Sequence, residues 1–215
     1  MTPPTAELLT LGQWLSPAYP VGGFAWSQGL EAAVAEGQVT DAAGLADWLA
    51  GVLEHGSGRN DAILLACAWR AEGDDLADLA ELAAALAPSA ARAAETREQG
   101  AAFAACTRAV WGLDLPDMAF PVAVGRAARL AGLPVAPVLA LWLQSVASNL
   151  VQAALRLMPL GQTAGQRVLH GLAPLIARLA QQAPGLGLDD LGSATLAADI
   201  AGMCQEALQP RIFRS

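Results

Sequence analysis

The residues whose type and spacing are most suggestive of catalysis lie around Ser27. Residues 25–29 set this serine two positions before a glycine, in an imitation of the nucleophile elbow of α/β-hydrolases. His55 or His170, together with a carboxylate, would have to complete a catalytic triad. The elbow requires a buried strand ahead of the serine, and the preceding residues 20–24 contain a proline and two glycines instead. A serine hydrolase is therefore retained only as the alternative function.

Cofactor and metal sites are not predicted. Residues 161–166 have the glycines of a phosphate-binding loop, but they lack the lysine followed by Ser/Thr that holds phosphate and magnesium. The three cysteines, Cys67, Cys106 and Cys204, are far apart and form no C-x-x-C pair, which argues against a disulfide framework and against a zinc site. We expect no catalytic residue, no cofactor and no metal ligand.

The elements that position these residues are predicted to be helices. Apolar residues recur at three- and four-residue steps along most of the chain, for example over residues 45–53 and 168–179, and no stretch alternates with period two. The pattern predicts an all-α fold, a single compact bundle-like domain of roughly nine or ten helices over residues 1–215. No Pro/Ser-rich linker divides the chain.

Helix boundaries have their own signals. Asp41, Asn60 and Ser193 stand where N-caps belong. Glycines stand where helices could stop: Gly37, Gly73, Gly112 and Gly132.

The segment 130–155 carries no charge, and it is long enough to raise the question of a membrane span. One side is apolar. The other carries a polar stripe that would lack partners in lipid, formed by Ser145, Ser148, Asn149, Gln152 and, just after the segment, Arg156. A central helix of a soluble bundle explains the pattern better. The stripe is then either an internal hydrogen-bonded network or a contact face.

Charge is unevenly distributed along the chain. The formal net charge is −8, yet residues 118–188 contain no acidic residue and five arginines. This stretch indicates a surface that takes negative charge from elsewhere, either from the acidic first half or from another protein. The low isoelectric point, about 4.6, argues against nucleic-acid binding. No basic and apolar leader follows Met1, so a cytoplasmic location is expected.

Residues 16–31 are unusually rich in turn-forming and aromatic residues. Prolines at 17 and 20, the pair Gly22–Gly23, and three aromatic side chains lie between stretches that read as helix. Ordinary helix connections are built from polar turn formers. The segment is therefore either a helical corner whose aromatics cover the core or a rigid binding surface.

Two further segments decide between these alternatives. Residues 156–166 read R-L-M-P-L-G-Q-T-A-G-Q, and the chain ends in R-I-F-R-S at 211–215. In order and spacing, the three segments resemble the urease accessory protein UreF family, whose pattern is S-P-x-x-P-V-G-G-F-x-x-S-x-G-L-E, then R-x-x-P-L-G-Q, then R-L-F-R-S. Residues 95–100 also resemble the charged mid-chain helix of that family. The chain departs from it at Gln205 and Gln209, where relatives tend to carry a histidine and a tyrosine.

The resemblance implies a non-catalytic scaffold for nickel insertion into urease. Such a protein bridges a UreD/UreH-type partner, which sits on the urease apoprotein, to the GTPase UreG, and a homodimer is expected. An influence on GTP hydrolysis by UreG belongs to the same expectation, as does the absence of nucleic-acid and membrane partners. The partner-binding residues that follow from the three matching segments are Tyr19, Pro20, Gly22, Gly23, Phe24, Ser27, Glu31, Arg156, Leu160, Gly161, Gln162, Arg211, Phe213 and Arg214.

Three local expectations accompany this assignment. Gly22 or Gly23 should have positive φ, so that residues 20–24 form a rigid turn. Arg156 should pair with a carboxylate, Glu31 or Glu98, or with helix-end carbonyls. Residues 211–215 should bind a partner and should be loosely packed in the isolated protein, because Pro210 ends the last helix.

Overall fold

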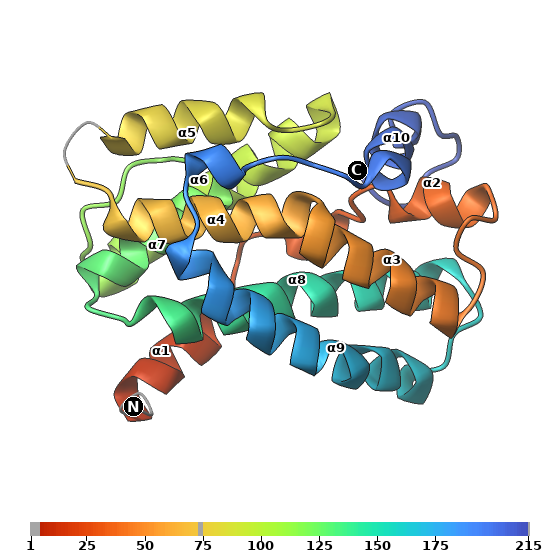
Figure 1. The fold of residues 1–215 in the computed structure, drawn as a ribbon, viewed down its shortest axis with the longest axis horizontal. Coiled ribbons are helices and arrows are strands. Elements are labelled where there is room, and N and C mark those ends of the chain that lie inside the picture. Colours follow the sequence, from red (N-terminus) through yellow and green to blue (C-terminus); the bar gives the residue numbers. More distant parts are fainter. Residues whose placement is uncertain (1–4, 73–74, 215) are drawn as a thin grey trace.

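The computed structural model describes residues 5–72 and 75–214, and within them every regular element is a helix (Figure 1). The predicted all-α class is thereby confirmed. The elements are α1 (Thr5–Trp14), η1 (Gly23–Ala25), α2 (Leu30–Ala35), α3 (Ala42–His55), α4 (Ser57–Arg70), α5 (Asp75–Ala85), α6 (Ala90–Trp111), α7 (Phe120–Leu130), α8 (Val135–Leu157), α9 (Gln162–Gln182), η2 (Ala183–Gly185), η3 (Leu188–Asp190) and α10 (Leu196–Gln205).

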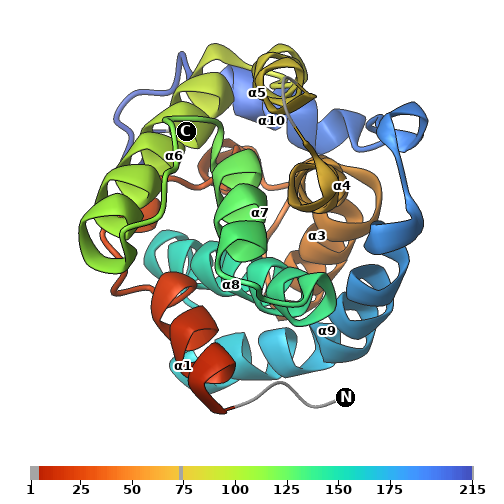
Figure 2. The same cartoon turned by 90° about the vertical axis from the view of Figure 1, so that its left-hand side faces the viewer.

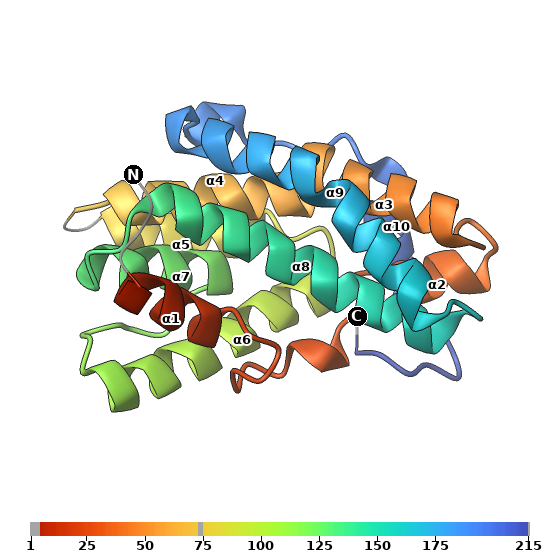
Figure 3. The ribbon, with the colours of Figure 1, turned by 90° about the horizontal axis from the view of Figure 1, so that it is seen from below.

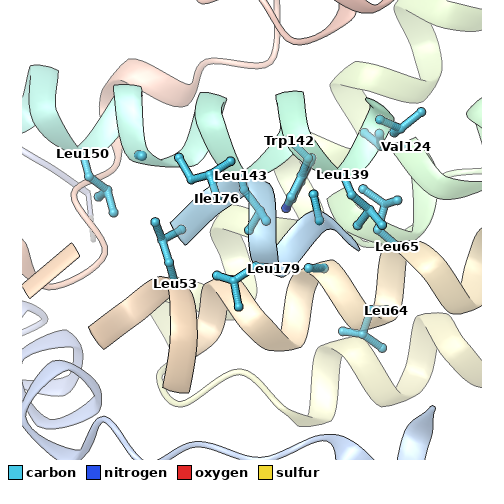
Figure 4. Close-up of a cluster of buried hydrophobic side chains, with 14 of the residues drawn as sticks. Leu53, Leu64, Leu65, Val124, Leu139, Trp142, Leu143, Leu150, Ile176 and Leu179 are labelled. Atoms are coloured by element: carbon cyan, nitrogen blue, oxygen red, sulfur yellow. The ribbon is translucent and has the colours of Figure 1, made fainter. Parts of the chain in front are cut away.

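The short helix α7 lies in the middle of the bundle, with α4 and α6 packed on either side of it (Figure 2). Helices α8 and α9 form an antiparallel pair, and α3 packs against both of them. Leucines and isoleucine from these helices interdigitate in the core, among them Leu53, Leu143, Ile176 and Leu179 (Figure 4). Burial of this apolar surface is the main force that holds the helices together.

Helix α8 is the uncharged segment that raised the question of a membrane span. Pro134 occupies its N-cap position, and it ends at Leu157, two residues before Pro159. In the described part of the chain it is the one helix long and apolar enough to cross a membrane, and half of its most apolar window is buried inside the protein. It runs along the lower face between α9 and α1, as Figure 3 shows. The helix is thus built into the core.

Some boundary signals are confirmed and others are wrong. The Asp41 side chain accepts a hydrogen bond from the backbone N–H of Gly44, as an N-cap should. Gly37, Gly112 and Gly132 have positive φ at helix ends. Gly73 lies outside the described residues.

Two predicted N-caps are wrong. Asn60 lies inside α4, where its side-chain oxygen accepts a hydrogen bond from the N–H of Gly192. Ser193 lies two residues before the N-cap position of α10, and its hydroxyl donates to Asp199. The Asn60 side chain is bonded by a segment far away in the sequence, and the Ser193 hydroxyl by a residue of the following helix. Neither side chain is therefore available to cap a helix.

Candidate partner-binding site

The first and last of the three matching segments meet at the carboxylate of Glu31, near the start of α2. Its two oxygens accept hydrogen bonds from the backbone N–H groups of Ile212, at 2.6 Å, and Phe213, at 2.9 Å. Gln205 of α10 donates a third hydrogen bond from Nε2 at 2.6 Å, while its own Oε1 accepts from the N–H of Ala32. Glu31 is buried, so these donors replace the water that a carboxylate needs.

The side chains of the tail are fixed by two arginine contacts. Phe213 is only 2% exposed, and the guanidinium of Arg156 lies 4.3 Å from the centre of its ring. The Arg214 guanidinium makes two hydrogen bonds to the Glu98 carboxylate, at 2.6 and 2.9 Å, and covers the Trp26 ring at 4.3 Å. Hydrogen bonding from Arg214 lowers the pKa of Glu98.

The expectation that residues 211–215 are loosely packed is wrong for the part that the structure describes. Pro210 does follow the last helix, but the residues after it are captured by Glu31 and by a pocket for Phe213. The backbone N–H of Arg214 also donates to the carbonyl of Ala25 at 2.8 Å. Arg211 and Ile212 remain exposed. The tail is therefore part of the fold through its backbone and Phe213, while the side chains of Arg211, Ile212 and Arg214 lie at the surface.

The turn at residues 20–24 contains the positive φ angle that its pair of glycines predicted. Gly22 has φ +70°, in the left-handed region that favours glycine, which confirms the expectation for this pair of glycines. Gly23 starts η1, and its carbonyl accepts a hydrogen bond from Nδ2 of Asn149 on α8 at 2.9 Å. Phe24 is 74% exposed. A large aromatic side chain is thus held in solvent by a turn that is bonded to the core helix.

Arg156 does not pair with either predicted carboxylate. Glu31 is occupied by the tail, and Glu98 by Arg214. Arg156 instead donates from its guanidinium to the carbonyl of Phe24 at 3.0 Å and stacks on Phe213. The choice of Glu31 and Glu98 was wrong because backbone N–H groups and the second arginine reach those carboxylates. Arg156 joins all three segments, since it lies in one and contacts the other two.

The remaining candidates divide by burial. The Tyr19 hydroxyl lies 2.9 Å from Oγ1 of Thr107 in the core, and burial raises the pKa of Tyr19. Pro20 is exposed at the start of the turn. Leu160, Gly161 and Gln162 form the corner between α8 and α9, and Gly161 and Gln162 are exposed there.

The geometry required of a serine hydrolase is absent from the described residues. Ser27 is completely buried, and its Oγ accepts the backbone N–H of Glu31, in the first turn of α2, at 3.4 Å. The residues before it form the 3-10 helix η1 rather than a strand. His55 and His170 are exposed on α3 and α9. A substrate carbonyl cannot reach a hydroxyl that has no exposed surface, so this alternative is wrong.

One buried charged cluster was missed by the sequence reading. Arg92 of α6 forms ion pairs with Asp61 of α4, at 2.6 Å, and with Glu95, at 3.5 Å. Burial raises the pKa of Asp61 to about 6, against the opposing effect of the Arg92 charge. Gln28 and Gln99 both donate to Glu95. The i,i+3 spacing of Arg92 and Glu95 could have predicted their ion pair from the sequence. The pairing of Arg92 with Asp61 could not be predicted in this way, because Asp61 lies on another helix.

No group of three or more His, Cys, Asp or Glu side chains with metal-binding geometry occurs among the residues that the structure describes.

Comparison with known proteins finds extensive sequence similarity. The profile of the UreF family matches residues 39–173. A protein named urease accessory protein UreF from Cereibacter sphaeroides strain KD131 is 56% identical over 211 residues, which cover 98% of this chain and 100% of that relative. A protein of the same name from Ruegeria pomeroyi is 45% identical over 215 residues, covering 100% of this chain and 99% of the relative.

The all-helical fold and the family match together define a non-catalytic accessory protein, and among the described residues the side chains of the three matching segments bind one another. The chain belongs to the UreF family of urease accessory proteins, which take part in urease maturation.

Proposed function

We propose that this chain is a scaffold for inserting nickel into the urease active site. It bridges a UreD/UreH-type protein, bound to the urease apoprotein, and the GTPase UreG, whose GTP hydrolysis it influences, and it acts in the cytoplasm as one domain. The observation that carries this proposal is the similarity to proteins named UreF over 97% of the chain. It is supported by the absence of an accessible nucleophile in the segment that looked most catalytic.

The C-terminal end offers a surface suited to a protein partner. Leu196, Ile200 and Met203 are all exposed on α10, at the i, i+4 and i+7 spacing that places them on one face of the helix. Ile212 and Arg211 are exposed on the tail, which shares the Glu31 carboxylate with Gln205 of the same helix. We assign this surface, called the α10–tail face, to the UreD/UreH-type partner.

A homodimer is the second part of the proposal. Exposed apolar side chains elsewhere, including Leu8 and Leu9 of α1 and Leu130 of α7, give a second copy apolar surface to cover. Light scattering of the purified chain across a range of concentrations measures the mass directly. A mass of one chain at every concentration contradicts this part and leaves the scaffold role untouched.

Binding of purified partners tests the scaffold. We expect the wild-type chain to retain the UreD/UreH-type protein and UreG together on an affinity resin, and neither partner to retain the other without it. Changing Leu196, Ile200 and Met203 to serine together should weaken retention of the UreD/UreH-type partner without lowering the melting temperature. The matched control changes the exposed Gln166 and Gln181 of α9 to serine. Equal retention by both variants contradicts the assignment of this face.

A further inference from the structure

A groove lies between α1, residues 15–24 and α8. Its volume is about 310 Å³, and its apolar lining includes Leu11, Trp14, Val21, Phe120 and Val146. Figure 3 shows α1 beside α8 on this side of the protein. The volume falls at the low end of the roughly 300 to 1,000 Å³ range of binding pockets.

One wall of the groove is the polar stripe of α8, which the structure divides in two. Asn149 and Arg156 are engaged with the carbonyls of η1. Gln144, Ser148 and Gln152 also belong to that helix and line the groove, and their side chains make no hydrogen bond within the described part of the chain. Part of the stripe is therefore an internal network, whereas Gln144, Ser148 and Gln152 form a row of unused donors and acceptors.

The spacing of that row fits an extended peptide. Successive members are four residues apart, which in a helix is a rise of about 6 Å. Alternate residues of an extended chain are about 6.6 Å apart and present their N–H and C=O groups to the same side. Amide and hydroxyl side chains both donate and accept, so each member can bond one such residue. A helical occupant would leave the row unused, because its backbone groups are already bonded internally.

The groove also selects by charge. The chain has a formal net charge of −8, yet no described residue that lines the groove is charged. A Lys, Arg, Asp or Glu buried there would lose hydration without gaining an ion pair, which is costly. At one end Phe24 projects from its rigid turn and lines the same groove, where its ring can cover an apolar side chain.

We propose that the groove binds an extended, uncharged segment of a partner protein, in which apolar side chains at alternate positions enter the apolar floor. The backbone of that segment is hydrogen-bonded by Gln144, Ser148 and Gln152. The partner is a component of the urease maturation machinery, an identification that rests on the proposed function. Binding of the peptide itself does not rest on it.

A capped hexapeptide of alternating valine and serine is the probe. The readout is the side-chain amide NMR signals of Gln144 and Gln152 in the ¹⁵N-labelled full chain, with the exposed amides of Gln166 and Gln181 on α9 as internal references. We expect the first pair of signals to shift with peptide concentration and the reference pair to stay fixed. Peptides with glutamate or lysine in place of a central valine should bind at least about tenfold more weakly, because the charge would be buried in the groove without an ion pair. Tenfold weaker binding corresponds to about 1.4 kcal/mol.

The double variant Gln144→Ala and Gln152→Ala should weaken binding of the neutral peptide by about thirtyfold, since it removes two hydrogen bonds of about 1 kcal/mol each. Gln166→Ala with Gln181→Ala should leave it unchanged. Three results each overturn the proposal: no shift up to the solubility limit of the peptide, equal binding of charged and neutral peptides, or shifts that follow protein concentration alone. The last would identify a second copy as the occupant.

Urease activation separates this proposal from the scaffold role. Gln144→Glu with Gln152→Glu places two charges in the groove and should reduce activation, whereas Gln166→Glu with Gln181→Glu should not. If the α10–tail variant stops activation and the groove variant does not, the scaffold role stands and a role for the groove in maturation is excluded.

Discussion

The carboxylate of Glu31 accepts the backbone N–H of Phe213 at 2.9 Å, although 182 positions separate the two residues in the sequence. A single buried acid in the first quarter of the chain thereby holds the last residues that the structure describes. Because the bond is to backbone, it holds the tail whatever side chains the tail carries. The tail is positioned by α2, and its exposed residues are presented from a fixed place.

Glu31→Gln should destabilise the protein by about 1 to 3 kcal/mol, because an amide cannot accept all three donors and leaves buried N–H groups without partners. The free energy of unfolding in urea measures this effect. Glu81→Gln on the exposed side of α5 is the matched control and should change stability by less than about 0.5 kcal/mol. Equal stability of the two variants would show that water replaces Glu31 at the tail.

Phe213→Ala should lower stability by about 3 kcal/mol or more, as expected for removing a buried aromatic side chain. Ile212→Ala, next to it but 59% exposed, should lower it by less than about 0.5 kcal/mol. Thermal unfolding of both variants provides the comparison. If Phe213→Ala has the same melting temperature as the wild type, the aromatic ring contributes to partner binding alone, and the tail is not part of the core.

Two glycines with positive φ should differ in their response to alanine. Gly22, with φ +70°, has nothing within 4 Å of an added Cβ, so Gly22→Ala should cost only backbone strain, about 1 kcal/mol. Gly29 has φ +82°, and its Cβ would lie 2.6 Å from the backbone nitrogen of Gly202 in α10. Gly29→Ala must therefore also displace α10, and its loss of stability should clearly exceed that of Gly22→Ala. Equal losses would mean that α10 moves freely.

The buried Asp61 should make stability depend on pH in a defined direction. Burial raises its pKa from 3.8 to about 6, so the folded state binds a proton more tightly than the unfolded state does. This contribution is fully present below pH 3.8 and is lost as the pH rises through about 6. The stability difference between wild type and Asp61→Asn should consequently fall over this window and stay level above it.

Urea unfolding at several pH values measures this difference. Asp47→Asn, at an exposed position of α3, is the control and should show no such trend. A difference that rises with pH would mean that the Arg92 charge outweighs burial at Asp61.

The sequence by itself determined the helical class, because apolar residues at helical spacing and the absence of two-residue alternation leave no other way to bury them. It also determined α8 as a core helix, since Pro134 and Pro159 bracket it and its polar stripe excludes lipid. The left-handed turn at Gly22 was likewise visible, because a glycine pair beside a proline restricts the backbone locally.

Only the tertiary structure decided how the charges pair. The sequence shows Arg156, Arg214, Glu31 and Glu98 but not which of them meet. The prediction gave Arg156 an acid or helix-end carbonyls as partner, and in the fold it bonds the carbonyl of Phe24 and stacks on the ring of Phe213. The same holds for the tail, whose local sequence predicts a frayed end and whose packing depends on α2, α6 and α8. Local sequence sets backbone preferences within a few residues, whereas partners from distant segments are fixed only when the helices pack.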